Sequence, residues 1–351
     1  MKMIFRPNYD KAEREAYKLL QLADVRDFPV KFKKLTKQFS NLKLRKYSWF
    51  AKKWGYTIEE VCELTNSNEG CCWYLKNRQQ YLILYNDTIE NLGRVRWTIA
   101  HELGHFMLKH NEITNKAIYT RNSLTEEEYD VFEKEANCFA RNLLAPQSLI
   151  YQLKPTDPNT ISDIFNVSFE AANNILNFFI NGINRGISYS KDHFTHNLFR
   201  DFIHKHKYGK TCLNCSCFFI SKQASYCKVC GSVNLIQGEK EHMEYTKFIL
   251  DNNSRAVDCP TCANEQVYGD YCHVCGTYLI NKCTGLSVDE FTHHNSQNRI
   301  MWHEEEGCQN LLEGNARFCE RCGSASTFYL NKLLIDWEHE YESRKKEELP
   351  F

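Results

Sequence analysis

The chain has 351 residues, and its 44 basic residues balance its 44 acidic ones, so net charge alone favours neither a nucleic acid nor a membrane surface as partner. No run approaches the roughly 18 apolar residues of a membrane span, and the first residues lack an apolar signal-peptide core. We therefore expect a cytoplasmic protein that contacts no membrane. Its 17 cysteines would stay reduced there, which favours metal binding over disulfides.

The first 205 residues show the periodicity of a mostly helical α+β domain. The expected elements are helices over about residues 10–23, 95–110 and 126–144, the strand-like Leu82–Tyr85, and a connecting helix or linker over residues 191–210. Pro146 ends the third helix. Residues 1–205 should therefore form one domain with a core of its own.

His101, Glu102 and His105 form an H-E-x-x-H motif in the second predicted helix. Two histidines four residues apart lie on one helical face, so both rings can bind one zinc ion. Glu102 lies beside that ion and can take a proton from a zinc-bound water, whose pKa the metal lowers to about 7. The motif also occurs by chance on solvated helices, but apolar neighbours such as Phe106 indicate a buried helix, where imidazoles need partners. Gly104 indicates close approach by another segment, such as a substrate.

A catalytic zinc has three protein ligands and an open position, and the next helix offers the third ligand. Glu133 flanks the apolar stripe of that helix and is the first candidate, with Asn137 one turn later as a hydrogen-bond partner of the site. Glu135 points about 200° away; it is the second candidate, and we expect it to be solvated. Ordinary surface glutamates are the alternative interpretation. His110 is a poor ligand candidate, because on a continuous helix it faces away from the motif.

These segments resemble the ImmA/IrrE-type zinc metallopeptidases. The similarity rests on Thr98–His105, on the E-x-x-A-N pattern from Glu133, on Leu143–Pro146 and on the strand-like Tyr81–Asn86. It covers about residues 1–185, although the family often has methionine where this chain has Ala145. The resemblance implies an endopeptidase inside bacteria, with Glu133 as its zinc glutamate. Its implied substrate is a helix-turn-helix repressor of a mobile element, prophage or stress regulon.

Residues 161–180 are typical of a helix, a short turn and a second helix, a unit that family members often carry after the peptidase core. Few basic residues lie on the second helix to meet phosphates. We therefore favour a packing element that binds no DNA. A transcription factor acting through residues 161–176 is a weaker alternative, which a gel shift at varied salt would test.

Residues 206–335 contain paired C-x-x-C motifs, which are typical of zinc ribbons. Two such turns aim four thiolates at one point, and a glycine after the second turn permits a positive φ. The first ribbon (about residues 212–231) offers Cys212, Cys215, Cys227 and Cys230, and the second (259–276) offers Cys259, Cys262, Cys272 and Cys275. A thioredoxin-like redox motif would need a βαβ context, which these pairs lack.

A third ribbon (residues 283–323) has its first turn split. Its predicted ligands are Cys283, Cys308, Cys319 and Cys322, with residues 284–307 as an insertion and His303 as a possible substitute for Cys283 or Cys308. The other cysteines are a spectator, Cys217, and four residues without ligand spacing that we expect to be small buried side chains, Cys62, Cys71, Cys72 and Cys138.

The two halves of the chain differ in charge. Residues 1–205 carry 29 basic and 24 acidic residues, whereas residues 206–351 carry 15 and 20. Three four-thiolate zinc sites would make the second half more negative still, so direct nucleic-acid binding is not expected to dominate. We expect the ribbons to recognise a protein substrate or partner; dimerisation or simple stabilisation is the alternative.

The sequence thus predicts a zinc endopeptidase domain, three small β ribbons and a charged, solvated helix or tail over residues 336–351, with one catalytic and about three structural zinc ions. Thr327–Leu330 and Leu333–Ile335 are expected to pack on the third ribbon. The mechanism also needs an oxyanion donor; the sequence offers Tyr119, Tyr129 and His110 without distinguishing them. The competing hypothesis is a non-catalytic zinc-ribbon adaptor or antitoxin-like regulator built on a peptidase core.

Overall fold

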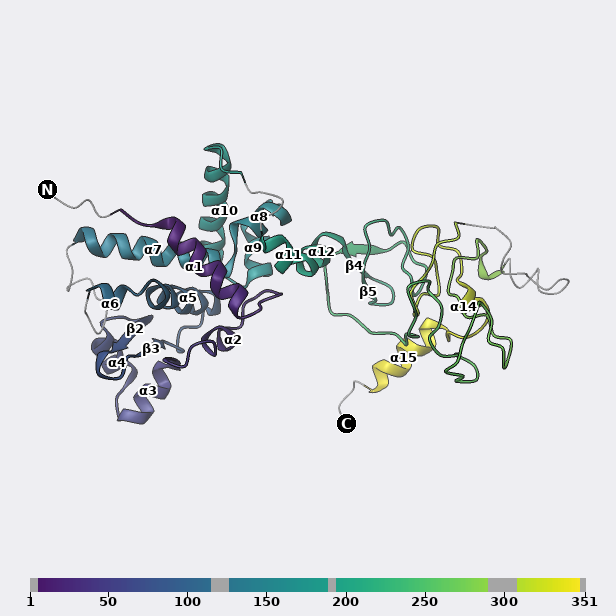
Figure 1. Ribbon diagram of the computed structural model, residues 1–351, viewed down its shortest axis with the longest axis horizontal. Coiled ribbons are helices and arrows are strands. Elements are labelled where there is room, and N and C mark those ends of the chain that lie inside the picture. Colours follow the sequence, from purple (N-terminus) through teal and green to yellow (C-terminus); the bar gives the residue numbers. More distant parts are fainter. Residues whose placement is uncertain (1–5, 115–125, 189–193, 290–307, 348–351) are drawn as a thin grey trace. The chain divides into compact units, whose positions relative to one another are not determined.

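The computed structural model describes residues 6–114, 126–188, 194–289 and 308–347 (Figure 1). The chain divides into two compact units, Met1–Ile203 and His204–Phe351. Helices and small sheets occur together, so the predicted α+β class is confirmed. Among the described residues, every helix is too short or too polar to cross a membrane.

The first unit is mostly helical. Its helices are α1 (Tyr9–Leu22), α2 (Phe32–Thr36), α3 (Tyr47–Trp54), α4 (Ile58–Thr65), the 3₁₀ turn η1 (Lys76–Arg78), α5 (Leu92–Leu108), α6 (His110–Thr114), α7 (Glu126–Leu144), α8 (Gln147–Leu153), α9 (Pro158–Phe165), α10 (Phe169–Asn184), α11 (Phe194–Leu198) and the start of α12 (Arg200–Tyr208). The three predicted long helices are present, and α5 ends two residues earlier than expected.

A three-stranded sheet supports the long helices of this unit. Strand β3 (Gln80–Tyr85) lies in the centre, parallel to β1 (Leu42–Lys46) and antiparallel to β2 (Gly70–Leu75). Figure 1 shows α5 between this sheet and α7, with α3 and α4 beyond the sheet. Helix α5 is therefore the central element of the unit, and its middle carries the H-E-x-x-H motif.

The sheet is covered on both faces, as its alternating side chains show. Cys72 and Ile83 belong to the main core with α5 and α7, whereas Cys71 and Leu84 pack with residues of α3 and α4. Successive residues of a strand point to opposite faces, so β2 and β3 join the two layers. Burial of both faces explains why Leu82–Tyr85 is a continuous apolar run.

Helices α5 and α7 approach closely at Gly104. A Cβ atom on Gly104 would lie 3.1 Å from the Cα atom of Ala136 and 3.2 Å from its carbonyl oxygen. The close approach expected from this glycine therefore exists, but the neighbouring segment is α7 and not a substrate. This contact fixes the distance between the two helices that carry the candidate ligands.

The predicted helix–turn–helix segment corresponds to α9 and α10. Asn166 adopts a positive φ of 51° after α9, and Ser168 caps α10 through its side chain. Ile161, Phe165 and Ile175 are fully buried in the main core of the unit. Both helices thus contribute side chains to the core, which agrees with a packing role.

The second unit has little regular structure. Strands β4 (Gly209–Cys212), β5 (Phe218–Ile220) and β6 (Leu235–Gln237) form an antiparallel sheet of order β5-β4-β6 in the first ribbon. In the second and third ribbons the described residues form only isolated bridges, such as Tyr271 with Tyr278. Side-chain packing and the cysteine groups must therefore hold these ribbons together.

The first and third ribbons dock through their second cysteine turns. The backbone N–H of Tyr226 donates to the carbonyl oxygen of Glu320 over 3.0 Å, and the N–H of Phe318 donates to that of Lys228, also over 3.0 Å. The Phe318 ring also lies against Gly231. Two turns with the same local structure thus bind each other reciprocally, so the ribbons form one body and not a string of separate modules.

Two sequence expectations for the end of the chain were only partly correct. Phe328, on α14 (Thr327–Leu330), and Leu334 pack in the core of the second ribbon. The centre of the Tyr329 ring, however, lies 5.2 Å from that of the Phe318 ring in the third ribbon.

The charged segment after residue 336 forms α15 (Trp337–Glu347), whose Glu340 is only 4% exposed. Arg317 from the third ribbon donates to that carboxylate over 2.7 Å. A buried ion pair therefore ties α15 to the unit. The predicted helix is present and residues such as Glu338 and His339 are exposed, but Glu340 is not solvated.

Candidate functional site

The side chains of His101, His105 and Glu133 converge in the first unit, with donor atoms within 4.8 Å of one another. The Nε2 atoms of the two histidines lie 3.0 Å apart. The Glu133 carboxylate lies 3.2 Å from Nε2 of His101 and 3.5 Å from Nε2 of His105. Two imidazoles and one carboxylate are a donor set of catalytic zinc sites. The three residues therefore fit a single zinc ion.

The hydrogen bond of His101 turns its Nε2 atom to this centre. Its Nδ1 atom lies 3.0 Å from Oδ1 of Asn137 on α7. An amide oxygen only accepts, so Nδ1–H of His101 donates, and Nε2 keeps a free lone pair. Asn137 thus has the supporting position that the sequence predicted for it.

A buried chain of hydrogen-bonded polar groups likewise turns the Nε2 atom of His105 to the centre. Its Nδ1 atom lies 2.9 Å from Nδ1 of His110, and Nε2 of His110 lies 2.9 Å from Oε2 of Glu135. The other oxygen of Glu135 accepts from the backbone N–H of Asn8 over 2.6 Å. A carboxylate only accepts, so His110 donates from Nε2 and accepts at Nδ1. His105 therefore donates from Nδ1, which leaves the lone pair of its Nε2 facing the centre.

The sequence did not predict this series of hydrogen bonds from His105 to Glu135. Glu135 was expected to be solvated, yet it is only 8% exposed, and His110 is fully buried. The reason is that α5 ends at Leu108 and Lys109 adopts a φ of 62°, so the backbone turns His110 towards His105. A glycine after a helix indicates in the sequence that the helix ends there in the left-handed region. A lysine at the same position gives no such indication. Periodicity alone therefore placed His110 on the wrong side.

The candidate metal centre opens into a cleft of about 550 Å³. The cleft is lined by Thr65, Asn66, Ser67, Asn68, Glu69, Gly70, Cys71, Trp97, Thr98, His101, Glu102, His105, Tyr129, Glu133 and Asn137. Of the three possible oxyanion donors, Tyr129 lines the cleft, His110 is fully buried, and Tyr119 lies outside the described residues. The three candidate ligands and Glu102 thus border the same cleft.

Glu102 has the environment of a proton acceptor near neutral pH. Burial raises its pKa to about 7, although the charge of His101 acts in the opposite direction. The backbone N–H of Cys72, on the neighbouring strand β2, donates to its carboxylate. A base with a pKa near the working pH is the most effective in proton transfer.

The two histidines differ in their tendency to hold a proton. Burial lowers the pKa of His105 to about 3, so its ring is neutral, the form that binds a metal. Burial also opposes a charge on His101, but Glu133 outweighs it and raises the pKa of His101 to about 9. Because a cation at the centre would compete with that proton, metal uptake should release it.

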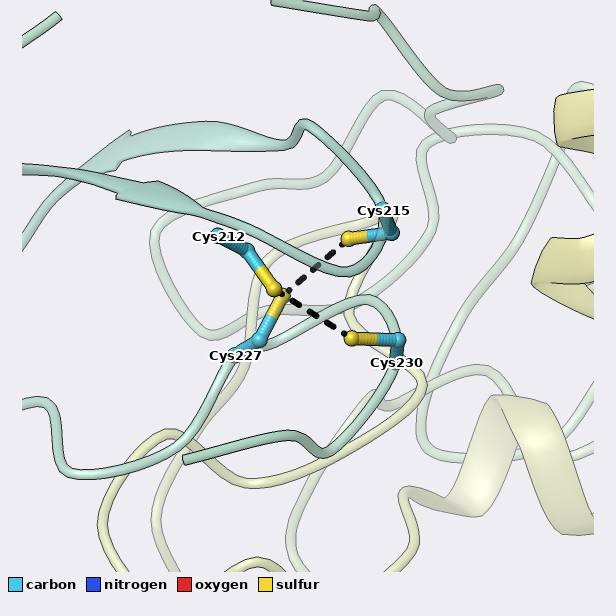
Figure 2. Close-up of side chains that lie close together, drawn as sticks. All are labelled: Cys212, Cys215, Cys227 and Cys230. Carbon is cyan, nitrogen blue, oxygen red and sulfur yellow. Dashed lines mark hydrogen bonds between the residues drawn. The ribbon is translucent and has the colours of Figure 1, made fainter. Parts of the chain in front are cut away.

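Three groups of four cysteines form in the second unit, and they contain the residues predicted for the three ribbons. Figure 2 shows the first group, in which two turns point their sulfurs towards a common centre. Within this group Sγ of Cys212 lies 3.5 Å from Sγ of Cys230, and Sγ of Cys215 lies 3.5 Å from Sγ of Cys227. A tetrahedron with Zn–S bonds of about 2.3 Å has S–S edges of about 3.8 Å. The first group therefore fits zinc.

The second and third groups have the same geometry. The S–S distances are 3.5 Å between Cys259 and Cys275, 3.7 Å between Cys262 and Cys272, 3.4 Å between Cys283 and Cys322 and 3.5 Å between Cys308 and Cys319. The two halves of the split turn are thus brought together. Most of the predicted insertion, with His303, lies outside the described residues. Gly231, Gly276 and Gly323 have φ angles of 71°, 76° and 79°, as expected after the second turn.

The remaining cysteines lie outside these groups. Cys71, Cys72, Cys138 and Cys217 are buried, and Cys62 is partly exposed. Burial raises the pKa of Cys72 well above its ordinary value, which makes this thiol unreactive. These residues are thus packing side chains in the described structure. The sequence predicted burial for Cys71, Cys72 and Cys138 correctly, whereas Cys62 is partly exposed.

Comparison with known families identifies part of the first unit. Residues 69–177 match the family model of the IrrE N-terminal-like domain, Peptidase_M78. The match contains both helices that carry the candidate ligands, α5 and α7, and confirms the resemblance inferred from the motifs. It does not extend to the cysteine groups. No curated protein matches the chain.

Proposed function

Because residues 69–177 carry an IrrE N-terminal-like domain, we propose that the protein is a zinc-dependent endopeptidase. One observation carries the proposal: the donor atoms of His101, His105 and Glu133 converge in a cleft that Glu102 also lines. Asn137 and His110 orient the two histidines, and the close contact of α5 with α7 at Gly104 sets the distance to Glu133. Ligands positioned by such supporting contacts are what catalysis requires.

A bound zinc ion would supply an activated water molecule and polarise the peptide carbonyl. Glu102 accepts the proton of the attacking water and then delivers it to the leaving amine nitrogen. Asn137 and His110 keep the two imidazoles in the tautomers that present Nε2 to the centre. Tyr129, which lines the cleft, is the candidate to stabilise the oxyanion.

The proposed substrate is a protein, and specifically a helix-turn-helix repressor, as the family resemblance implies. Residues 206–351 carry 15 basic and 20 acidic residues, and thiolate–zinc groups would add further negative charge. DNA-binding proteins carry basic surfaces, so the second unit would attract such a substrate electrostatically. Substrate recognition is accordingly the proposed role of the ribbons.

Replacing Glu102 with Gln tests this function. The purified variant should lose cleavage of the proposed repressor substrate by at least about 100-fold, because proton transfer contributes roughly 10²–10⁴ in rate. It should keep the metal, since its ligands are intact. Glu90→Gln, at an exposed glutamate outside the cleft, is the matched control and should cleave at the wild-type rate.

The assay also separates the enzyme from the non-catalytic adaptor. If Glu102→Gln cleaves as fast as the wild type, the proposed mechanism is wrong. If neither protein cleaves the repressor and both relieve its repression equally, the adaptor hypothesis replaces the enzyme.

A further inference from the structure

A stretch of the first unit is basic without interruption. Between Phe28 and Ile58 the chain has nine basic residues and no acidic one. The nine are Lys31, Lys33, Lys34, Lys37, Lys43, Arg45, Lys46, Lys52 and Lys53. In the rest of residues 1–205 acidic residues outnumber basic ones. The positive charge of the first half is therefore concentrated in this stretch.

These side chains are available to an anionic partner. All nine are exposed. In the part of the chain that the structure describes, only Lys46 of the nine forms an ion pair, with Asp87 at 3.5 Å. A cluster of like charges opposes folding through self-repulsion, and among the described residues Asp87 offsets only one of these nine charges with an ion pair. Such a cluster is typical of a surface that binds polyanions.

Exposed aromatic rings lie among the charges. Trp49, Trp54 and Tyr56 are 38%, 61% and 45% exposed. Nζ of Lys53 lies 4.9 Å from the centre of the Trp49 ring, and the guanidinium carbon of Arg45 lies 5.2 Å from the same ring. Nζ of Lys53 also lies 5.5 Å from the centre of the Trp54 ring. Exposed rings grouped at one surface mark an interaction site, and here both tryptophans lie next to a cation.

Trp49 also separates two hollows. The first, of about 740 Å³, is lined by Trp49 and by basic residues that include Lys43 and Arg45. The second, of about 750 Å³, is lined by Trp49, Lys53 and Trp54 and also by Tyr56, Lys76 and Arg78. The two hollows therefore meet at Trp49, and both are lined by cations and aromatic rings.

We propose that this surface, the Trp49 surface, binds single-stranded nucleic acid. Lysine and arginine side chains would neutralise the phosphates, and unpaired bases would stack on the exposed rings. A duplex offers phosphates but keeps its bases stacked inside, so the rings would not contribute. Binding here is independent of peptide hydrolysis, because the surface and the metal cleft share no lining residue.

The test is fluorescence anisotropy of the full-length protein with labelled 20-nucleotide oligothymidine and oligouridine between 50 and 200 mM NaCl. Binding should weaken with salt, and Lys43→Glu/Lys53→Glu, with one change in each hollow, should weaken it by at least about 10-fold. For this double variant, the slope of the logarithm of the binding constant against the logarithm of the salt concentration should fall in magnitude by about 1.4, or about 0.7 per lost phosphate contact. Trp54→Ala should weaken binding by about 5- to 100-fold, the range expected for loss of one stacked base.

The controls change the same numbers of charges and rings elsewhere. Arg14→Glu/Lys222→Glu replaces two exposed cations outside the surface, and Tyr268→Ala removes a ring that is 74% exposed. Both should bind within about 2-fold of the wild type. Zinc content and circular dichroism should be the same in all variants, which shows that folding is unchanged.

The two oligonucleotides show whether RNA or DNA is preferred, and either preference supports the proposal. It is overturned if neither oligonucleotide binds at 50 mM NaCl, if a 20-base-pair duplex binds more tightly than both, or if phosphatidylglycerol vesicles bind and the oligonucleotides do not. Equal losses in the surface variants and their controls would also overturn it.

Discussion

In the first unit the candidate metal centre lies on a hydrophobic core that is complete without it, whereas in the second unit cysteines are themselves part of the cores. The main core of the first unit includes side chains from α1, α5, α7 and α10. The small cores of the second unit include Cys212, Cys259 and Cys283. Modules this short bury too little apolar surface to fold alone. We therefore expect an exchangeable metal in the first unit and structural metals in the second.

Loss of one structural zinc ligand should show this difference between the two units most clearly. Cys227→Ser should unfold the second unit, since apparent zinc-binding energies of about 10–16 kcal/mol contribute to folding in such modules. The first unit should stay folded, and limited proteolysis should leave a fragment that ends near residue 203.

The matched control for this experiment is Cys217→Ala, at a buried cysteine outside the metal groups. It should keep both units resistant to protease. Proteolysis of the first unit in Cys227→Ser, or of the second unit in both variants, would contradict the comparison.

The ion pair of α15 tests whether side-chain packing also holds the second unit. The Arg317 and Glu340 side chains are 0% and 5% exposed, so Glu340→Gln leaves a buried guanidinium without the negative charge that compensates it. The expected loss is roughly 3–5 kcal/mol of unfolding free energy, measured by urea denaturation of the zinc-loaded protein. Glu338→Gln, at an exposed neighbour, should change it little.

The loss in Glu340→Gln should depend on pH. Burial opposes the charged form of Glu340, but hydrogen bonds from Thr246, Arg344 and Arg317 outweigh burial and lower its pKa. The stabilisation is therefore complete above the ordinary pKa of glutamate and is lost as the pH falls through the lowered value. Wild type and variant should converge in acid; a constant difference would exclude this explanation.

The smallest expected effect is on metal affinity in the first unit. His110→Phe keeps a ring in the buried position but removes the acceptor for His105, so zinc affinity should fall about 10- to 100-fold. His110→Gln, whose amide oxygen can accept the same hydrogen bond, should recover part of it. Competition with a fluorescent zinc chelator measures both. Equal affinity of His110→Phe and wild type would show that His110 does not orient the ligand.

Local spacing was sufficient to predict much of the site. The i, i+4 histidines of α5 and the paired cysteine turns need only one turn of backbone to be placed, and the structure brings their donor atoms together. Glu133 could be chosen because α7 is a regular helix with a clear apolar stripe. These predictions depended on periodicity and short-range geometry, which the sequence contains directly.

The remainder depended on contacts between distant segments. The turn at Lys109 reorients His110, and its partner Glu135 is buried because the N–H of Asn8 also binds it. Glu340 looked like part of a solvated helix until Arg317 was placed beside it. The sequence does not show that a polar side chain of a helix is buried when its hydrogen-bond partner lies more than a hundred residues away or on another module.

The central claim, one zinc ion held by His101, His105 and Glu133 in an open cleft, is tested most directly by counting metal ions. Native mass spectrometry of the purified protein and of Glu133→Ala should give four and three zinc ions per chain. The missing ion should be the one that a mild chelator removes from the wild type. Four ions in both proteins, or three in both, would contradict the account.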